Sequence, residues 1–344
     1  MDHPTGLAAK FVIVGDGWVA RTCYLPALRR LGAAEPVVID SAPEHGGAAA
    51  VQRALAMARG RRDLLAIVAT PNASHWPLAA AFLEAGARVL VEKPLSLPGE
   101  VDRAAPGLDS DALSRLWVSA PYRFRPDVVR LMAAVAAGRI GAVREVRAAW
   151  RRRAGIPRPG SWYTSRRWAG GGVLVDLGPH LLDVALALTD WPEVAVTASS
   201  FATAADWRIS ASGWMPDGGR DELPCDVEVA ARLELSDAAG RRYEVEVAWA
   251  SDVEEDVTTI EVVGSHGRLE LVTLFGFAPG RTVGRLAGAV TAEIALDRDP
   301  ATDFARLIAA VERGEAATGH QGLQVMAVIA AAYRAGGATT AVPR

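Results

Sequence analysis

Short runs of aliphatic and β-branched residues alternate with longer helical stretches over the first 120 residues. Four strands are expected at residues 11–14, 37–40, 64–69 and 89–91. Between them, apolar positions recur at helical spacing. Strands separated by about 10–15 helical residues predict βαβ units and a parallel sheet. Such a sheet binds its ligands at the carboxyl ends of its strands.

After residue 121 the pattern changes, and most of the expected strands are no longer separated by helices. We expect strands at 143–151, 194–198, 227–235, 242–250, 258–263 and 268–272. A helical run follows the glycines at 170–172 and continues to residue 188. Two closing helices are expected at 303–312 and 321–335. The pattern predicts a mostly antiparallel sheet with helices on one face.

The fold class predicted is therefore α/β followed by α+β. Residues 1–121 would form a parallel-sheet domain, and residues 122–344 a second domain with a large, mostly antiparallel open sheet. The closing helices, 303–335, are in a position to pack back on the first domain. A chain of 344 residues is long enough for two such domains.

Composition narrows the class of protein. Half of the residues are hydrophobic and 22% are charged, which excludes a largely disordered chain. The net charge of −3 gives no indication of a nucleic-acid partner. Cys23 and Cys225 fit neither a disulfide framework nor a zinc site. With no signal-peptide pattern and no apolar run long enough for a membrane span, we expect a cytoplasmic protein without a membrane partner.

A glycine-rich turn, Gly15-x-Gly17-x-x-Ala20, lies between the first strand and the first helix, and Asp40 ends the second strand. The first glycine permits a tight turn, and the second lets the backbone approach a pyrophosphate. Asp40 would bind both ribose hydroxyls, which favours NAD over NADP. The alternative is a glycine turn without a ligand. Expected cofactor contacts here are Gly15, Gly17, Trp18, Val19, Ala20 and Asp40.

Two further motifs follow the third and fourth strands, Thr70-Pro-Asn-Ala-Ser-His75 and Glu92-Lys93-Pro94. Both lie where a parallel sheet has its ligand crevice. A cis bond before Pro94 would direct Lys93 into that crevice. The alternatives are a proline turn with a helix cap and a surface ion pair at a strand end. Expected cofactor contacts here are Thr70, Asn72, His75, Glu92 and Lys93.

Asp176, His180 and Asp183 have the spacing i, i+4, i+7, so on one continuous helix they would share a face. A carboxylate one turn from an imidazole orients it and raises its basicity, as a general base requires. One alternative is a His–Asp pair satisfied in the core. A second is a metal site, which neither cysteine nor a matching histidine elsewhere supports.

Together these motifs resemble the Gfo/Idh/MocA oxidoreductases over nearly the whole chain. The resemblance rests on the glycine turn, on Thr-Pro-Asn-x-x-His75, on Glu-Lys-Pro94 and on Gly170-Gly-Gly-x-x-x-Asp176-x-Gly-x-His180. It implies an N-terminal Rossmann domain and a C-terminal open sheet whose outer face commonly forms an oligomer interface. A homodimer or homotetramer built on strands 194–272 is therefore expected.

The resemblance also implies a bound nicotinamide cofactor and reversible oxidation of a hydroxyl group on a sugar or cyclitol. By position, Lys93 and His180 would be the acid/base pair, facing one another beside the nicotinamide, with Asp176 as their substrate-side partner. Either Lys93 or His180 could move the proton. Expected substrate contacts are Tyr122, Arg123, Trp162, Arg166 and Arg167.

Two acidic stretches, 206–226 and 252–256, would suit a substrate that bears amines, or would be solvated loops. Members of the family act in making antibiotic sugars, so an aminoglycoside or aminocyclitol substrate is the specific hypothesis. Two other functions stay open. One is an NAD-dependent glycoside hydrolase of the same architecture, and the other is a non-catalytic regulator that binds the cofactor.

Overall fold

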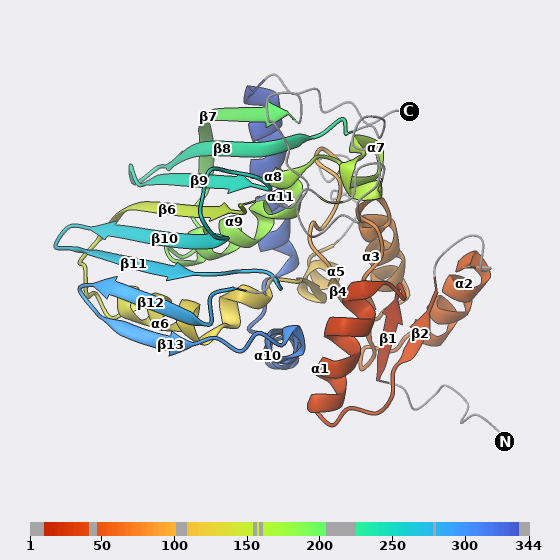
Figure 1. Cartoon of the computed structure of the whole chain (residues 1–344). Coiled ribbons are helices and arrows are strands. Elements are labelled where there is room, and N and C mark those ends of the chain that lie inside the picture. Colours follow the sequence, from red (N-terminus) through yellow and green to blue (C-terminus); the bar gives the residue numbers. More distant parts are fainter. Residues whose placement is uncertain are drawn as a thin grey trace. The chain divides into compact units, whose positions relative to one another are not determined.

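The computed structural model describes residues 10–40, 47–100, 109–153, 157, 161–203, 225–277 and 280–336 (Figure 1). The chain divides into two compact units. The first comprises residues 1–121 together with 299–323, and the second comprises 122–298 together with 324–344. A segment from late in the sequence thus completes the N-terminal unit.

The first unit contains a five-stranded parallel sheet in the order β2-β1-β3-β4-β5. Its strands are β1 (Phe11–Val14), β2 (Val37–Ile39), β3 (Leu65–Val68), β4 (Arg88–Val91) and β5 (Leu116–Val118). β1 and β3 are buried along their whole length, as expected of a sheet with helices on both faces. The predicted parallel sheet is confirmed. β5 was not predicted, because three residues carry no periodicity.

Most helices of the first unit lie between its strands in sequence, and α10 joins the unit from late in the chain. They are η1 (Ala20–Tyr24), α1 (Leu25–Arg30), α2 (Gly47–Ala58), η3 (Asn72–Ser74), α3 (His75–Glu84), α5 (Ser110–Ser114) and α10 (Pro300–Arg313). The helix expected after the glycine turn starts with a π-helical segment, η1. α10 packs on this region: the Tyr24 and Phe304 rings meet edge to face at 4.8 Å, and Arg30 pairs with Asp299.

The second unit contains an eight-stranded sheet in the order β13-β12-β11-β10-β6-β9-β8-β7. Every neighbouring pair is antiparallel except β6 and β9. The strands are β6 (Val143–Arg151), β7 (Val194–Thr203), β8 (Glu228–Asp237), β9 (Arg242–Ala248), β10 (Val257–Gly264), β11 (Arg268–Thr273), β12 (Val283–Gly288) and β13 (Ala292–Ala295). The large, mostly antiparallel sheet is confirmed. β12 and β13 were missed, because Gly284 and Gly288 weaken the strand pattern.

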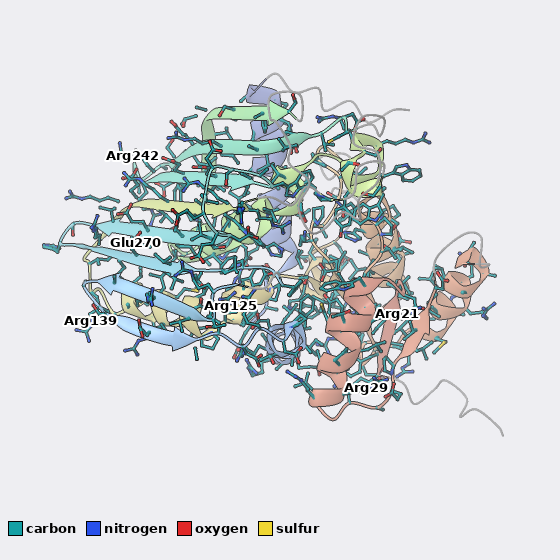
Figure 2. All side chains as sticks on the ribbon, in the orientation of Figure 1. Arg21, Arg29, Arg125, Arg139, Arg242 and Glu270 are labelled. Carbon is teal, nitrogen blue, oxygen red and sulfur yellow. The ribbon has the colours of Figure 1, made fainter. Side chains whose placement is uncertain are left out.

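Helices cover one face of this sheet, and charged side chains stand on the other (Figures 1 and 2). The remaining elements are η5 (Pro121–Phe124), α6 (Pro126–Ala136), η6 (Trp162–Thr164), α7 (Arg166–Ala169), α8 (Val173–Asp176), α9 (Gly178–Ala187) and α11 (Gly319–Ala335), of which η5 and α11 begin with residues of the first unit. Along β6 and β11, buried and more exposed residues alternate, and Arg242 and Glu270 belong to the charged face. The sheet is therefore covered by helices on one face only, as the sequence predicted.

The single helix predicted after the glycines at 170–172 is wrong. The structure has two short helices, α8 and α9, separated at Leu177. Segments 166–176 and 178–187 meet at 45°. Pro179, in the first turn of α9, lacks the N–H that a continuous helix would need there. Asp176 therefore ends one helix, while His180 and Asp183 lie on the next.

Among the described residues, no single helix is both long and apolar enough to cross a bilayer. The bent pair 166–176 and 178–187 reaches that length and composition only when its two parts are taken together.

Candidate functional site

The glycine turn is shaped by two different requirements. Gly15 has φ +107°, and a Cβ there would lie 2.2 Å from the carbonyl oxygen of Ala69, so only glycine fits. Around Gly17, in contrast, no described atom would lie within 4 Å of an added Cβ. Packing within the described chain thus gives no reason for Gly17, while the approach of a pyrophosphate does. The turn therefore fits a dinucleotide.

Asp40 follows directly on β2, beside this turn. The Gly15 amide donates to Ile39 O at 2.8 Å, which ties the end of β2 to the turn. Arg21 lies on the next helical turn and pairs with Asp16 at 2.6 Å. Asp16, and to a smaller extent Asp40, raise the pKa of Arg21. The expected contact of Asp40 with a ribose stays a prediction.

His75 links the ends of β3 and β4. Its side chain is buried, with Nε2 2.7 Å from Thr70 O and Nδ1 2.7 Å from Pro94 O. Burial lowers the pKa of His75 to about 4, against the effect of the two carbonyl groups. The Lys93–Pro94 bond is cis. The ring therefore fixes the turn that carries Lys93, and the expected contact of His75 with the cofactor stays a prediction.

Glu92 is directed into the core of the first unit. Its Oε1 accepts a hydrogen bond from the Tyr24 hydroxyl at 2.7 Å, and that hydroxyl lies 3.2 Å from Ser119 Oγ. Burial raises the pKa of Glu92. Thr70 and Asn72 are also buried, and Ser74 Oγ donates to Thr70 Oγ1 at 2.7 Å. Contacts of these residues with the cofactor remain predictions.

In the second unit, α8 and α9 present Asp176 and His180. Asp176 Oδ2 accepts a hydrogen bond from Trp249 Nε1 at 2.9 Å. His180 is 8% exposed, and its ring meets Tyr122 edge-on at 4.8 Å and lies 6.0 Å from Trp150. These aromatic rings restrict the orientation of the imidazole. No spacing in the sequence pointed to Trp249 or Trp150.

Asp183 does not act as a free carboxylate. Asp183 Oδ2 accepts a hydrogen bond from Arg123 Nε at 3.0 Å, and a second contact makes the pair bidentate. The Arg123 guanidinium also lies 5.0 Å from the centre of the Trp191 ring. Burial raises the pKa of Asp183, and the positive charge of Arg123 opposes that rise. This pair anchors α9 to the chain that enters the second unit.

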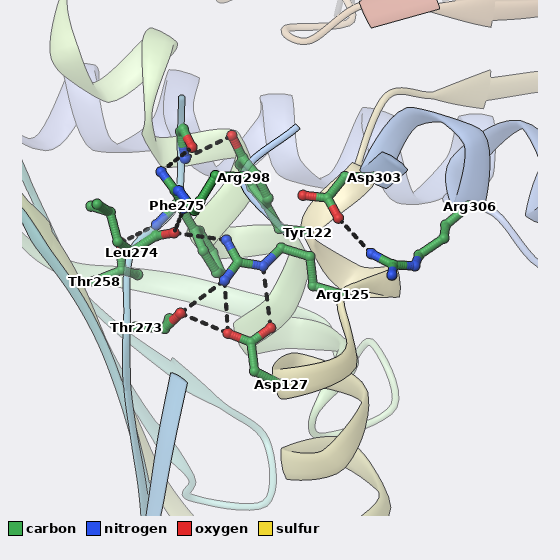
Figure 3. A network of polar contacts seen from close by, with 11 residues as sticks. Tyr122, Arg125, Asp127, Thr258, Thr273, Leu274, Phe275, Arg298, Asp303 and Arg306 are labelled. Atoms are coloured by element: carbon green, nitrogen blue, oxygen red, sulfur yellow. Dashed lines mark hydrogen bonds and ion pairs between the residues drawn. The ribbon is translucent and has the colours of Figure 1, made fainter. Parts of the chain in front are cut away.

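A buried network surrounds Tyr122, one of the rings that contact His180 (Figure 3). Arg125 Nη2 pairs with Asp127 Oδ2 at 2.8 Å, and Arg125 Nη1 donates to Leu274 O at 2.7 Å. Tyr122 stacks on Phe275 with ring centres 4.4 Å apart, and its hydroxyl accepts from the Gly276 amide at 2.9 Å. Sequence reasoning missed this network, since its members are up to 154 positions apart in the sequence.

The expected substrate contacts near residue 165 form an aromatic and basic segment. Trp162 stacks on Tyr163 at 3.7 Å, and the exposed Arg167 lies 5.2 Å from the Trp168 ring. The Arg166 amide donates to Asp226 Oδ1 at 2.7 Å, and its guanidinium lies 5.8 Å from the Tyr333 ring. Their roles toward a substrate stay predictions.

Of the two acidic stretches, the structure describes residues 252–256 in full and only the end of 206–226. Positions 206–224 lie outside the described residues. In the second stretch, Asp256 Oδ1 accepts from the Arg153 amide at 2.8 Å and Glu255 pairs with Arg281. Throughout the described part of the chain, no group of three His, Cys, Asp or Glu residues is arranged to hold a metal ion.

Comparison with protein families gives two matches on this one chain. Residues 9–105 match the model of an oxidoreductase family with an NAD-binding Rossmann fold. Residues 128–270 match the model of the GFO/IDH/MocA C-terminal domain. The two matches together span more than half of the sequence.

Among curated proteins, a relative from Amycolatopsis mediterranei described as a UDP-kanosamine synthase oxidoreductase subunit is 35% identical over 289 residues. The alignment covers 80% of this chain and 78% of that protein. The D-glucoside 3-dehydrogenase of Escherichia coli is 31% identical over 161 residues, which is 46% of each chain.

Solved structures share the fold. A protein of gentamicin A biosynthesis, crystallised with NAD, has a TM-score of 0.66 at 24% identity and covers 98% of this chain and 97% of its own. Levoglucosan dehydrogenase, in complex with NADH and levoglucosan, has a TM-score of 0.70 at 21% identity, covering 95% of this chain and 97% of its own.

Proposed function

Because this chain belongs to the Gfo/Idh/MocA family of NAD-binding oxidoreductases, we propose that it is an NAD-dependent dehydrogenase that oxidises a secondary hydroxyl group of a glucose-type sugar to a ketone, and catalyses the reverse reduction. The sequence-based predictions of the family, of a dehydrogenase or reductase and of an NAD-binding Rossmann domain are confirmed.

One observation carries the proposal. Both family models match along a single chain that keeps Lys93 after β4 and Asp176 and His180 on α8 and α9. A regulator that only binds the cofactor would not need all three side chains. The proposal therefore assigns them chemical roles.

The chemistry needs a proton acceptor and a stabilising positive charge. NAD, when bound, takes the hydride from the carbinol carbon of the sugar. In the proposal, His180 accepts the hydroxyl proton, since an imidazole is a suitable base near neutral pH. The Lys93 ammonium group stabilises the alkoxide character that develops on the same oxygen. Asp176 accepts a hydrogen bond from a sugar hydroxyl and so orients the ring.

The named relatives support carbon 3 as the position that reacts. Kanosamine is 3-amino-3-deoxyglucose, and an amine at carbon 3 can be introduced after the 3-hydroxyl has become a ketone. The second relative is named for oxidation at the same carbon of a glucoside. We therefore propose the 3-hydroxyl of a glucose unit as the reacting group.

What is attached to the glucose unit distinguishes two substrates. Arg167 stacked on Trp168, with Trp162 nearby in sequence, suits a nucleoside diphosphate, because arginine binds phosphate and the indoles stack on a base. This favours a nucleotide-linked glucose. The aminoglycoside hypothesis rested on the acidic stretches and on the resemblance to enzymes that make antibiotic sugars. In the described part of those stretches, Glu255 and Asp256 are already paired with Arg281 and with the Arg153 amide.

The test is a cofactor-reduction screen. Purified protein is incubated with NAD or NADP and with UDP-glucose, glucose, methyl glucoside, myo-inositol or an aminoglycoside, and absorbance at the wavelength of the reduced cofactor is followed. Reduction of NAD with UDP-glucose, giving a 3-keto product by mass spectrometry, supports the proposal. No reduction with any of these sugars contradicts it.

The same screen separates the other functions. Cleavage of a glycoside without net consumption of NAD would identify a hydrolase. Tight binding of NAD without turnover of any sugar would identify a regulator.

A further inference from the structure

We propose that Glu228 and Trp249 are positioning residues that hold the two ends of α8, and thereby place Asp176 and His180 for the reaction. This inference rests on the proposed function for its kinetic consequences, but the contact it describes can be tested without any substrate. Neither residue was indicated by a sequence motif.

Glu228 holds the beginning of α8. Its Oε1 accepts hydrogen bonds from the Gly172 amide at 2.8 Å and the Leu174 amide at 3.1 Å. The first amides of a helix have no acceptor within the helix, so an outside acceptor is needed. The N-cap residue, Gly172, has no side chain to supply one. A carboxylate from β8 takes that place.

The glycine motif is explained by the same contact. A Cβ on Gly172 would lie 2.0 Å from Glu228 O, and a Cβ on Gly171 would lie 2.0 Å from the Tyr333 hydroxyl. That hydroxyl donates to Glu228 Oε1 at 2.7 Å. Glycines at 171 and 172 thus let the start of α8 come close enough to Glu228 and Tyr333 for these hydrogen bonds to form.

Glu228 is costly to keep for stability alone. It is 3% exposed, and its Oε2 has no hydrogen-bond partner among the described residues, with Arg166 Nη2 3.9 Å away. Burial raises the pKa of Glu228, while the three donors to Oε1 act in the opposite direction. Burying a carboxyl group that is only partly hydrogen-bonded is unfavourable. A buried carboxyl group at this position is explained if α8 must be held in one place.

Trp249 holds the other end of α8. Its indole N–H can only donate, and it donates to Asp176 Oδ2 at 2.9 Å. The indole itself is fixed, because Trp249 is fully buried and its backbone amide donates to Val229 O at 2.9 Å. Val229 is the residue next to Glu228. Both ends of α8 are therefore tied to the same short part of the β8–β9 pair.

The consequence reaches both proposed catalytic side chains. Asp176 is the last residue of α8, and its carboxylate is oriented directly by the Trp249 indole. His180 lies in the first turn of α9, a helix that begins after one intervening residue, Leu177. Catalytic groups must be held to within about 0.5 Å to be effective. A shift of α8 would move Asp176 and the start of α9 together.

The contact is tested first by hydrogen exchange of the whole protein in the absence of ligands. In Glu228→Ala, the amides of Gly172 and Leu174 are expected to exchange at least tenfold faster, with the amides of β9 unchanged. In Glu228→Gln, which keeps the acceptor oxygen, protection is expected to be restored. Equal protection of these two amides in wild type and Glu228→Ala would overturn the proposal that Glu228 holds the start of α8.

The kinetic test uses the substrate found in the screen. Glu228→Ala is expected to lower kcat about tenfold, because α8 loses the acceptor that holds its first amides, and Glu228→Gln to recover most of it. Glu234→Gln, an exposed glutamate on the same strand, is the matched control and should keep wild-type rates. The dissociation constant of NAD should stay the same in all three.

Trp249 is tested in a double-mutant cycle with Asp176. Trp249→Phe keeps the buried ring and removes only the donor, and it is expected to lower kcat/KM about fivefold, in the range of one ordinary hydrogen bond. In the Asp176→Ala background the same change should have less than a twofold effect. An equal loss in both backgrounds would show that Trp249 does not act through Asp176 and would overturn its role.

The outcomes separate the two proposals. If wild-type protein oxidises no sugar, yet the amides of Gly172 and Leu174 lose protection in Glu228→Ala, then the proposed function is wrong. The contact between Glu228 and the start of α8 is then still supported. If the sugar is oxidised and Glu228→Ala turns over at the wild-type rate, the positioning role is wrong and the proposed function stands.

Discussion

Lys93 and His180 are expected to contribute to the transition state far more than to cofactor binding. Lys93→Ala and His180→Ala should each lower kcat by a factor on the order of 10², because each removes a group that handles the developing charge or the proton. The measurement is steady-state kinetics with the identified sugar, beside NAD titration by fluorescence, where binding should be retained.

Two exposed residues serve as controls for these variants. Lys10→Ala and His320→Ala remove a lysine and a histidine outside the proposed machinery, and both should turn over normally. Normal turnover by His180→Ala would show that the histidine on α9 is structural. Loss of activity with EDTA and its return with a divalent metal would point to a different mechanism.

Asp40 is expected to determine the choice of cofactor. A 2′-phosphate would be repelled by this carboxylate, so kcat/KM should be one to two orders of magnitude higher with NAD than with NADP. Asp40→Ala should reduce the difference in kcat/KM between the two cofactors, mainly by weakening the binding of NAD. Asp16→Ala is an informative companion, because it frees Arg21 from its ion pair beside Asp40 and should improve the use of NADP. Equal efficiencies in wild type would contradict this prediction.

At the scale of single elements, Glu92 at the end of β4 predicts a pH dependence of stability. Its pKa is raised by burial, so between its unfolded value near 4.5 and its folded value the native state binds more protons than the unfolded state. The contribution of the carboxyl group to stability is therefore largest at low pH and is lost as the pH rises through the folded pKa.

This dependence is measured as the free energy of unfolding of wild type and Glu92→Gln between pH 4.5 and 8. The free energy of unfolding of Glu92→Gln should increase relative to that of wild type as the pH rises. Glu84→Gln, an exposed glutamate of α3, should show no such trend. A difference between wild type and Glu92→Gln that does not change with pH would contradict the prediction.

The elements differ in how far the sequence predicted them. β1 and β3 are continuous apolar runs bounded by turns, and the strands from β6 to β11 alternate, so local pattern identified them. β5 is too short to carry a pattern. The break between α8 and α9 was overlooked although Pro179 marks it, because the apolar spacing continues through it.

For the candidate site, sequence motifs indicated the functional side chains but not the residues that form hydrogen bonds with them. Asp176 could be singled out from spacing, whereas Trp249, its hydrogen-bond donor, lies 73 positions away. The partner of Asp183 is Arg123, 60 positions earlier. Such pairs are set by strand register and helix packing, which local spacing and periodicity along the chain do not reveal.

At the scale of the whole molecule, the open face of the eight-stranded sheet predicts self-association. It carries ladders of opposite charges, among them Arg147 with Glu261, Arg151 with Glu246 and Arg232 with Glu244. We expect a dimer or tetramer built on the strands between 194 and 272, in which such charges also pair between copies. Because exposed ion pairs are screened, association should weaken as salt rises toward 1 M.

Light scattering at micromolar concentration, in 50 mM and 1 M sodium chloride, tests this prediction. Arg147→Glu, which places like charges beside Glu145 and Glu261, should shift the equilibrium toward monomer. Arg29→Glu, an exposed arginine of the first unit, is the control. A monomeric mass for the wild type at both salt concentrations would contradict the expectation.

The position of α10 in the first unit has a consequence for synthesis on the ribosome. Tyr24 is covered by Phe304, and residues 299–323 complete a unit that otherwise consists of residues 1–121. At 5–20 residues per second, about 10–35 s pass between the emergence of the two parts. The nascent chain must therefore keep this apolar surface uncovered while the strands of the second unit are made, and a chaperone that binds early would have to release it late.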